Sequence, residues 1–255
     1  MKRGYSVFGP AYARMFEQDL HHPDSVDHDI LKRMVLLDED SIDDLYADSM
    51  QTSKDVTDHP LYGFAQRFKA EDDVVSVARV LYFTKTLAER FDTPFEEMIF
   101  GGTEQEIIAR GTDWCTDMSR VGAALLQCLH IPARIVVLVD GTRAYHGHQV
   151  VEAFVEGRHV MCDFLAGVFS IGESRPALKD LLGKPDVIRR IYRDAVADDA
   201  RLDTLSRTFD LAAISTYDIT GVHRYMTSRP NAYYLALMKL EQTGEWLMGE
   251  TEEKP

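Results

Sequence analysis

The chain has 255 residues, of which 45% are hydrophobic and 27% charged, a composition typical of a globular protein with a real core. With 42 acidic against 28 basic residues, the formal net charge is −14, so neither nucleic acid nor an anionic membrane is expected as a partner. The three cysteines contain no CxxC pair, which excludes a disulfide scaffold and a cysteine-rich zinc module. The first 20 residues lack a secretory signal pattern, and no apolar run reaches the roughly 18 residues of a membrane span, so we expect a cytoplasmic protein.

Most of the negative charge lies between residues 16 and 59, where 13 acidic residues stand against 3 basic ones. Ile30, Met34 and Leu37 recur at helical spacing, which predicts one or two amphipathic helices with a solvated acidic face. The acidic run at 38–44 lacks the glycine and the closing glutamate of a calcium-binding loop. We therefore expect no metal site in this segment, and His21, His22 and His28 form no convincing ligand set.

Three helices are expected next, over 72–91, over 103–110, and from Cys115 to a stop at Ile131-Pro132. The first has an apolar stripe at helical spacing. Thr112 and Asp113 are residues that commonly cap helices, so they predict the start of the third helix. This prediction places Cys115 at a helix N-terminus.

The pattern then changes to short apolar and β-branched runs, which predict strands over 135–139, 148–155, 159–164 and 168–171. Asp140-Gly141 and Glu156-Gly157 are typical hairpin turns between them. From residue 176 onward the pattern again favours helices. The order predicts an α+β protein, with an antiparallel sheet packed on the helix that follows Thr112.

We expect a single domain over 1–255 with four parts. These are an acidic helical N-terminal segment (1–69), a core (70–175), a helical C-terminal segment (176–248) and a flexible tail (249–255).

Cys115, His148 and Asp163 together fit nucleophilic catalysis. A helix N-terminus favours the thiolate, and its N–H groups can stabilise an oxyanion. An imidazole on the neighbouring sheet would take and return the proton, with a carboxylate behind it to orient the ring. The turn at 156–157 places His148 and Asp163 at similar heights on adjacent strands, so they can meet these needs.

The sequence around these residues resembles that of the transglutaminase-like superfamily over about residues 72–171. Cys115 opens a leucine-rich helix that leads into His130-Ile-Pro-Ala-Arg134, which is similar to the family's Gly-Ile-Pro-Ala-Arg turn. A His followed four residues later by Glu stands at His148 and Glu152, and a strand ending in Asp stands at Asp163. The resemblance implies a papain-like core, with Cys115 as nucleophile, His148 as general acid/base and Asp163 as orienting group. It also implies an acyl-thioester intermediate and no cofactor.

Neighbouring residues receive lesser roles. Trp114 and His146 are expected in the substrate or oxyanion neighbourhood, whereas Asp113, Arg134 and Glu152 are expected to be structural. Cys128 and Cys162 are expected in the core. Two positions depart from the family pattern: Asp113 stands where a glycine is usual, and Val150 stands where an aromatic residue is common.

The function favoured by the resemblance is a cysteine protease or amidase acting on a protein, a peptide or a small amide, because bacterial relatives of this size are mostly peptidases. A transamidase that passes the acyl group to an amine would use the same residues. A non-catalytic protein-binding module that keeps the fold is a further hypothesis, permitted by Asp113 and Val150. A zinc-dependent glycanase of the same superfamily is disfavoured because the chain has no CxxC pair. The sequence does not define an oligomeric state.

Overall fold

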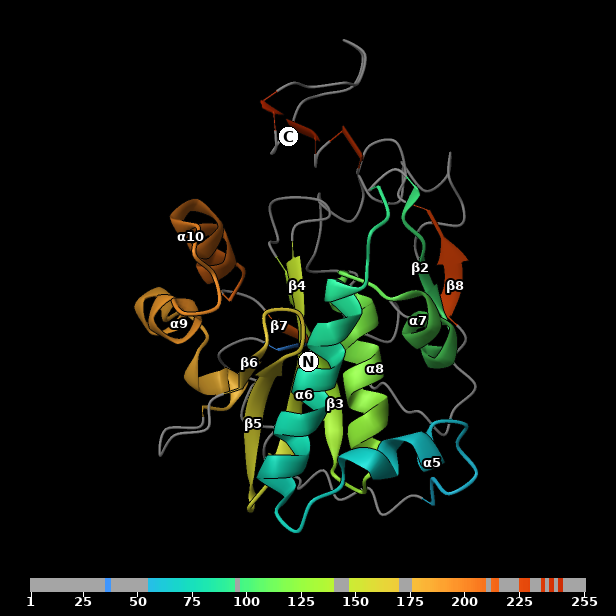
Figure 1. Ribbon diagram of the computed structural model, residues 1–255. Coiled ribbons are helices and arrows are strands. Elements are labelled where there is room, and N and C mark those ends of the chain that lie inside the picture. The colour runs from blue at the N-terminus through green and yellow to red at the C-terminus, as the bar shows by residue number, and fades with distance from the viewer. Residues whose placement is uncertain are drawn as a thin grey trace.

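The computed structural model describes residues 35–37, 55–94, 97–139, 147–169, 176–209, 212–215, 225–229, 235–236, 239–240 and 243–244 (Figure 1). Its helices, including short 3-10 turns, are α5 (Tyr62–Ala65), η1 (Gln66–Phe68), α6 (Asp73–Glu89), α7 (Glu104–Arg110), α8 (Cys115–Cys128), η3 (Leu178–Asp180), α9 (Pro185–Tyr192) and α10 (Asp199–Thr208). The strands are β1 (Val35–Leu37), β2 (Phe100–Gly102), β3 (Ala133–Val139), β4 (Gly147–Val155), β5 (Arg158–Asp163), β6 (Val168–Phe169), β7 (Ala212–Ser215) and β8 (Tyr225–Ser228).

The main sheet has six strands in the order β1-β7-β3-β4-β5-β6, and every neighbouring pair is antiparallel. A separate antiparallel pair joins β2 to β8. Helix α8 packs on β3 and β4 of the main sheet, as predicted for the helix that follows Thr112. The α+β class is therefore confirmed.

Two parts of the prediction are wrong. Strands β7 and β8 lie inside the segment 176–248 that the sequence predicts to be helical. Residues 35–37 form strand β1, although Leu37 belongs to the predicted helical pattern. In both places a run of four residues or fewer carries too little periodicity to define its state, and pairing within a sheet decides it. The remaining predicted structure of 16–54 and the tail 249–255 lie outside the described residues.

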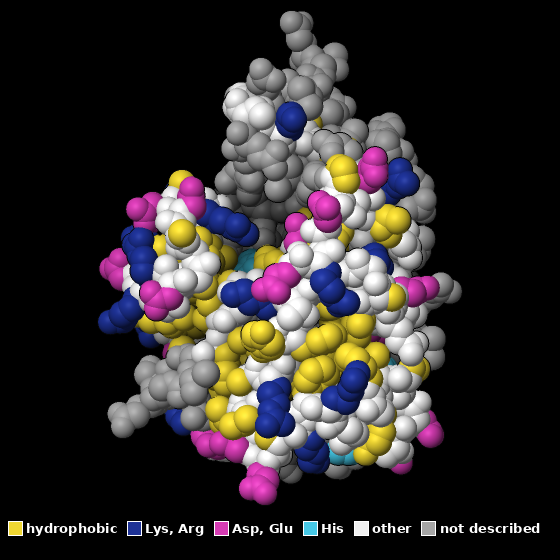
Figure 2. All heavy atoms as spheres, viewed as in Figure 1, with side chains coloured by type: hydrophobic (Ala, Val, Ile, Leu, Met, Phe, Trp, Pro, Cys, Tyr) yellow, Lys and Arg dark blue, Asp and Glu magenta, His cyan; other side chains and the backbone are white. Residues whose placement is uncertain are grey.

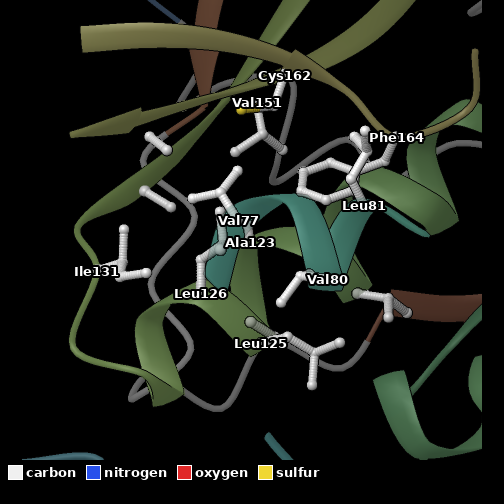
Figure 3. Packing of buried hydrophobic residues seen from close by; sticks show 14 of the residues in the cluster. Val77, Val80, Leu81, Ala123, Leu125, Leu126, Ile131, Val151, Cys162 and Phe164 are labelled. Atoms are coloured by element: carbon white, nitrogen blue, oxygen red, sulfur yellow. The ribbon is translucent and has the colours of Figure 1, made fainter. Parts of the chain in front are cut away.

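Helices α6 and α8 lie side by side over one face of the sheet (Figure 1). Helix α6 begins where the Asp72 carboxylate accepts a hydrogen bond from the Val74 N–H at 2.7 Å. Apolar side chains of the two helices meet those of the sheet in one large core cluster (Figure 3). The residues seen there include Val77, Val80 and Leu81 of α6, Ala123, Leu125 and Leu126 of α8, and Val151, Cys162 and Phe164 at the sheet.

The opposite face of the main sheet is also covered. Because successive strand residues alternate between faces, Val150 points away from the cluster that contains Val151. Val150 and Met161 pack instead with buried side chains of α9 and α10, among them Ile188 and Leu202. The sheet therefore lies between two helical layers, and α9 and α10 belong to the second one (Figure 1).

The outer face of α6 carries apolar side chains, with Val75 41% and Tyr82 74% exposed. Hydrophobic atoms gather on this face of the molecule (Figure 2). Within the described residues, no helix is both long and apolar enough to cross a bilayer.

Candidate active site

Cys115 is the first residue of α8 and is half-buried. The predicted cap is wrong: the N-cap residue is Trp114, whose side chain makes no capping hydrogen bond, while Thr112 Oγ1 accepts from the Trp114 N–H at 3.1 Å. The chain stays extended through Trp114, so the N-cap position lies one residue beyond the cap-type pair and the helix begins at Cys115. The first N–H groups of a helix have no partner within it and carry partial positive charge. The end of α8 beside Cys115 can therefore stabilise an anion.

Buried charges hold this end of α8 in place. Asp117 lies one half-turn after Cys115, and its carboxylate is 2.6 Å from Arg110 Nη2 of α7 and accepts from the Gly101 N–H of β2 at 3.0 Å. Burial raises the pKa of Asp117 above its ordinary value, and the charge of Arg110 partly offsets that rise. The Asp117 contacts were not predicted from sequence, yet they fix the helix that carries the thiol.

A second buried charge anchors the next turn of α8. Arg120, which is 1% exposed, pairs with Glu104 at 2.9 Å and donates to the Gly102 carbonyl at 2.9 Å. Together with Asp117, this side chain ties α8 to both α7 and β2. A buried arginine amid apolar positions of a helix gives no sequence signal of its partner.

His148 lies near the start of β4 and Asp163 at the end of β5. Because Val151 is opposite Cys162 in the ladder, Asp163 stands beside Val150, and His148 is its diagonal neighbour on the same face. The Nε2 atom of His148 is 2.5 Å from Oδ2 of Asp163, and both residues are buried. The register thus brings the predicted imidazole and carboxylate into direct contact.

The proton affinity of His148 reflects these neighbours. Burial by itself lowers the pKa of the ring, but the charge and hydrogen bond of Asp163 outweigh it, and a hydrogen bond and charge interaction with Cys115 add to them. The pKa of His148 is raised to about 10. Since Nε2 is engaged by Asp163, Nδ1 is the ring nitrogen left to face the thiol. Cys115, His148 and Asp163 therefore form one connected series.

The Asp163 carboxylate has four hydrogen-bond donors. Its Oδ1 accepts from the N–H groups of Leu165 at 3.0 Å and Ala166 at 2.9 Å. Its Oδ2 accepts from His148 and from the Tyr192 hydroxyl at 2.8 Å. Burial opposes ionisation, yet the charge of His148 and these hydrogen bonds hold the pKa of Asp163 below its ordinary value. The carboxylate is accordingly ionised at neutral pH.

Tyr192 was missed by the sequence interpretation. It is the last residue of α9, and its side chain is completely buried against the second face of the sheet. Helix α9 buries Ile188 and Tyr192. The four-residue spacing of Ile188 and Tyr192 was a usable signal for the buried face of α9.

Trp114, Asp113 and His146 are the residues that the sequence predicts near the thiol, and the structure describes only the first two. Trp114 is half-buried and stacks on Phe100 of β2, with ring centroids 5.3 Å apart. Asp113 is exposed; partial shielding from water raises the pKa of its carboxyl, and the charge of Arg201 on α10 opposes that rise. His146 lies outside the described residues. In Figure 2, histidine atoms are visible between the surface of α9 and α10 and that of the helices in front of the sheet.

Arg134 and Glu152 face each other on β3 and β4. Nε and Nη2 of Arg134 lie 2.9 and 2.6 Å from Glu152 Oε2, while Oε1 accepts from the Leu178 N–H at 2.7 Å. Both side chains are buried, so the structure places them together as an ion pair away from the thiol. Val150 is also fully buried, in the cluster under α9 and α10, and so it lines no open surface.

The other two cysteines lie in the core. Burial raises the pKa of the Cys128 thiol to about 12 and raises that of Cys162 as well. Cys128 Sγ is 3.5 Å from His59 Nδ1, a contact between two groups that burial keeps neutral, because burial lowers the pKa of His59. All three cysteines are free thiols, and Cys115 is the one that is not fully buried.

Comparisons with known proteins add little to this geometry. No protein-family model matches the chain, and no curated protein does. Among solved structures, the chain is similar to one described as a "Putative Cysteine Protease from Cytophaga hutchinsonii", with 22% sequence identity and a TM-score of 0.33. The similarity covers 51% of this chain, which spans 43% of that protein. The class that fold and site define is thus an α+β protein with a connected Cys–His–Asp series, and any function rests on those residues.

Proposed function

We propose that the chain is a cysteine-dependent amide hydrolase with a transglutaminase-like, papain-like catalytic core. Cys115 acts as nucleophile, His148 as general acid and base, and Asp163 as the group that orients the imidazole. The observation that carries this proposal is the connected series from the α8 thiol through His148 to the buried Asp163, with a distance of 2.5 Å in its second link. The order and the residues of the three sequence motifs around Cys115, His148 and Asp163 support it independently.

In the first half of the reaction, the Cys115 thiolate attacks the carbonyl carbon of an amide while His148 is protonated. The carbonyl π electrons move to oxygen, and the N–H groups at the start of α8 stabilise the oxyanion that forms. When the tetrahedral intermediate collapses, the C–N bond breaks and His148 gives its proton to the departing nitrogen. The products are a free amine and an acyl group in thioester linkage to Cys115.

In the second half, neutral His148 removes a proton from water, which attacks the thioester carbonyl. Collapse breaks the C–S bond, releases a carboxylic acid and restores the thiolate beside the protonated ring. Asp163 stays ionised throughout and holds the same ring nitrogen, so His148 can exchange protons without turning. An amine in place of water would give a transamidase on the same residues.

The proposed substrate is a peptide, a protein or a small amide. The test is mass spectrometry of a peptide library incubated with the wild-type protein, with Cys115→Ala and with Cys128→Ala, each with and without an added primary amine. We expect new fragments with the wild-type protein and with Cys128→Ala, and none with Cys115→Ala. Mass gain equal to the amine would identify a transamidase instead. The absence of any change that depends on Cys115 would contradict catalysis and favour a binding module.

A further inference from the structure

Tyr192 occupies an unusual place for a tyrosine at the end of a helix. Its ring is completely buried, and its hydroxyl donates to Asp163 Oδ2 at 2.8 Å and contacts Met161 Sδ at 3.8 Å. His148 Nε2 donates to the same Oδ2 atom. The hydroxyl and the imidazole therefore share one carboxylate oxygen, each from a different helical or strand element.

We infer that Tyr192 is a positioning residue of the site, whose hydroxyl fixes the Asp163 carboxylate and limits how strongly that carboxylate holds the proton on His148. This inference rests on the proposed function, since it concerns regulation of the same site. It goes beyond that proposal because it assigns a role to the α9 layer.

A donor to a carboxylate oxygen withdraws part of its negative charge. A second donor, the Tyr192 hydroxyl, therefore weakens the attraction between the Asp163 carboxylate and the protonated His148 ring. A general acid must release its proton to the leaving nitrogen, and too high a proton affinity slows that step. Burial, followed by the negative charge of Asp163, raises the pKa of Tyr192 well above its ordinary value, so the hydroxyl stays protonated and remains a donor.

Within the described residues, the titratable groups that act on His148 and Tyr192 come from two elements, α8 and β5. Cys115 of α8 acts on His148, and on β5 Cys162 acts on Tyr192 from the residue before Asp163. The Cys162 thiol is neutral because burial raises its pKa. The Cys115 thiol interacts directly with the His148 ring, so an experiment on the ring must remove it.

The test is an NMR titration of the His148 ring in a Cys115→Ala background, with Tyr192 intact, with Tyr192→Phe and with Ile188→Val. Tyr192→Phe keeps the ring and removes only the hydroxyl. Ile188→Val is the matched control, because it trims a completely buried side chain of the same helix and removes no hydrogen-bonding group. Circular dichroism and urea unfolding show that each variant is folded across the titration range.

We expect Tyr192→Phe to move the His148 midpoint upward by about half a pH unit or more, and Ile188→Val to leave it in place. A midpoint unchanged by Tyr192→Phe, or one moved equally by Ile188→Val, would overturn the inference.

In the Cys115-containing protein, kcat/KM should fall about tenfold with Tyr192→Phe, with the alkaline limb of its pH profile displaced in the same direction. The NMR result does not require activity, so a failed peptide assay with a shifted midpoint would reject the hydrolase and keep the link between Tyr192 and His148.

Discussion

The ring of Phe164 lies directly against Gly122, so close that a Cβ on the glycine would be 2.5 Å from the ring atom Cε2. Gly122 belongs to α8, which begins at Cys115, and Phe164 follows Asp163 at the end of β5. Through this contact, helix α8, which carries the thiol, packs closely against the end of strand β5, which carries the carboxylate. The missing side chain is what allows the two elements to approach.

Gly122→Ala should therefore destabilise the protein by about 1–3 kcal/mol, because the added methyl group overpacks a core that has no room for it. Urea unfolding monitored by circular dichroism measures the change. Gly63→Ala on α5 is the control, since beyond the adjoining residues and the backbone of its own helix no atom lies within 4 Å of the Cβ it would add. Equal stability of Gly122→Ala and the wild-type protein would contradict the tight seating of α8.

Asp163→Asn should reduce kcat by about a thousandfold or more while kcat of Asp180→Asn stays near that of the wild-type protein. An amide can donate to His148 but carries no charge to stabilise the imidazolium, so the ring loses both its orientation and its proton. Steady-state hydrolysis of whichever peptide the library identifies provides the measurement. Asp180 is an exposed aspartate away from the series, where its carboxylate accepts from the Ala177 N–H. Full activity of Asp163→Asn would show that this carboxylate has no role in the reaction.

The paired groups also predict how stability depends on pH. The His148 pKa rises from 6.5 to about 10 on folding, so its contribution is complete below pH 6.5 and is lost as the pH rises toward 10. The Asp163 pKa falls below 3.8, so its contribution is present above that pH and is lost as the pH falls through the folded-state value. Both contributions are complete between these two limits.

Urea unfolding of the wild-type protein and of His148→Gln at a series of pH values tests this dependence. The difference in unfolding free energy between the two proteins should shrink steadily from pH 6.5 to pH 10. A difference that stayed constant over this range would mean that the imidazole does not change its proton affinity on folding.

The buried pair of Arg134 and Glu152 should matter for stability and not for chemistry. Glu152→Gln leaves the Arg134 charge buried without its counterion, which costs about 3–5 kcal/mol when a buried pair is broken. Glu156→Gln is the matched control, because Glu156 pairs with Arg158 at 3.7 Å on the surface and such pairs contribute about 1 kcal/mol or less. If Glu152→Gln lowered kcat of the folded protein without lowering its stability, the pair would belong to the active site instead.

Local signals in the sequence predict the elements that carry the proposed site. A long apolar stripe, a leucine-rich helix after Cys115 and β-branched runs with hairpin turns correspond to α6, α8, β4 and β5 within a few residues. The face of β5 follows from strand alternation, which separates Cys162 from Asp163. These features depend on neighbours within a few positions, so periodicity alone is sufficient to find them.

Long-range pairing accounts for what the sequence missed. The four residues of β7 look helical because alanine favours helices, and only insertion between β1 and β3 makes them a strand. The contact from Tyr192 to Asp163 joins residues 29 positions apart, and Asp117 reaches Gly101 16 positions away. A polar side chain on a helix carries no mark of its distant partner, so both required the structure.

If His148 keeps Cys115 in its reactive form, the rate of Cys115 alkylation by iodoacetamide from pH 5 to pH 9 measures this most directly. The reference is Cys128 in the unfolded protein, and His148→Gln is the matched variant. At pH 6 we expect Cys115 in the folded wild-type protein to react at least about tenfold faster than the reference, since the thiolate is the reacting form. His148→Gln should remove that advantage. Reaction of wild-type Cys115 no faster than unfolded Cys128 would contradict the account.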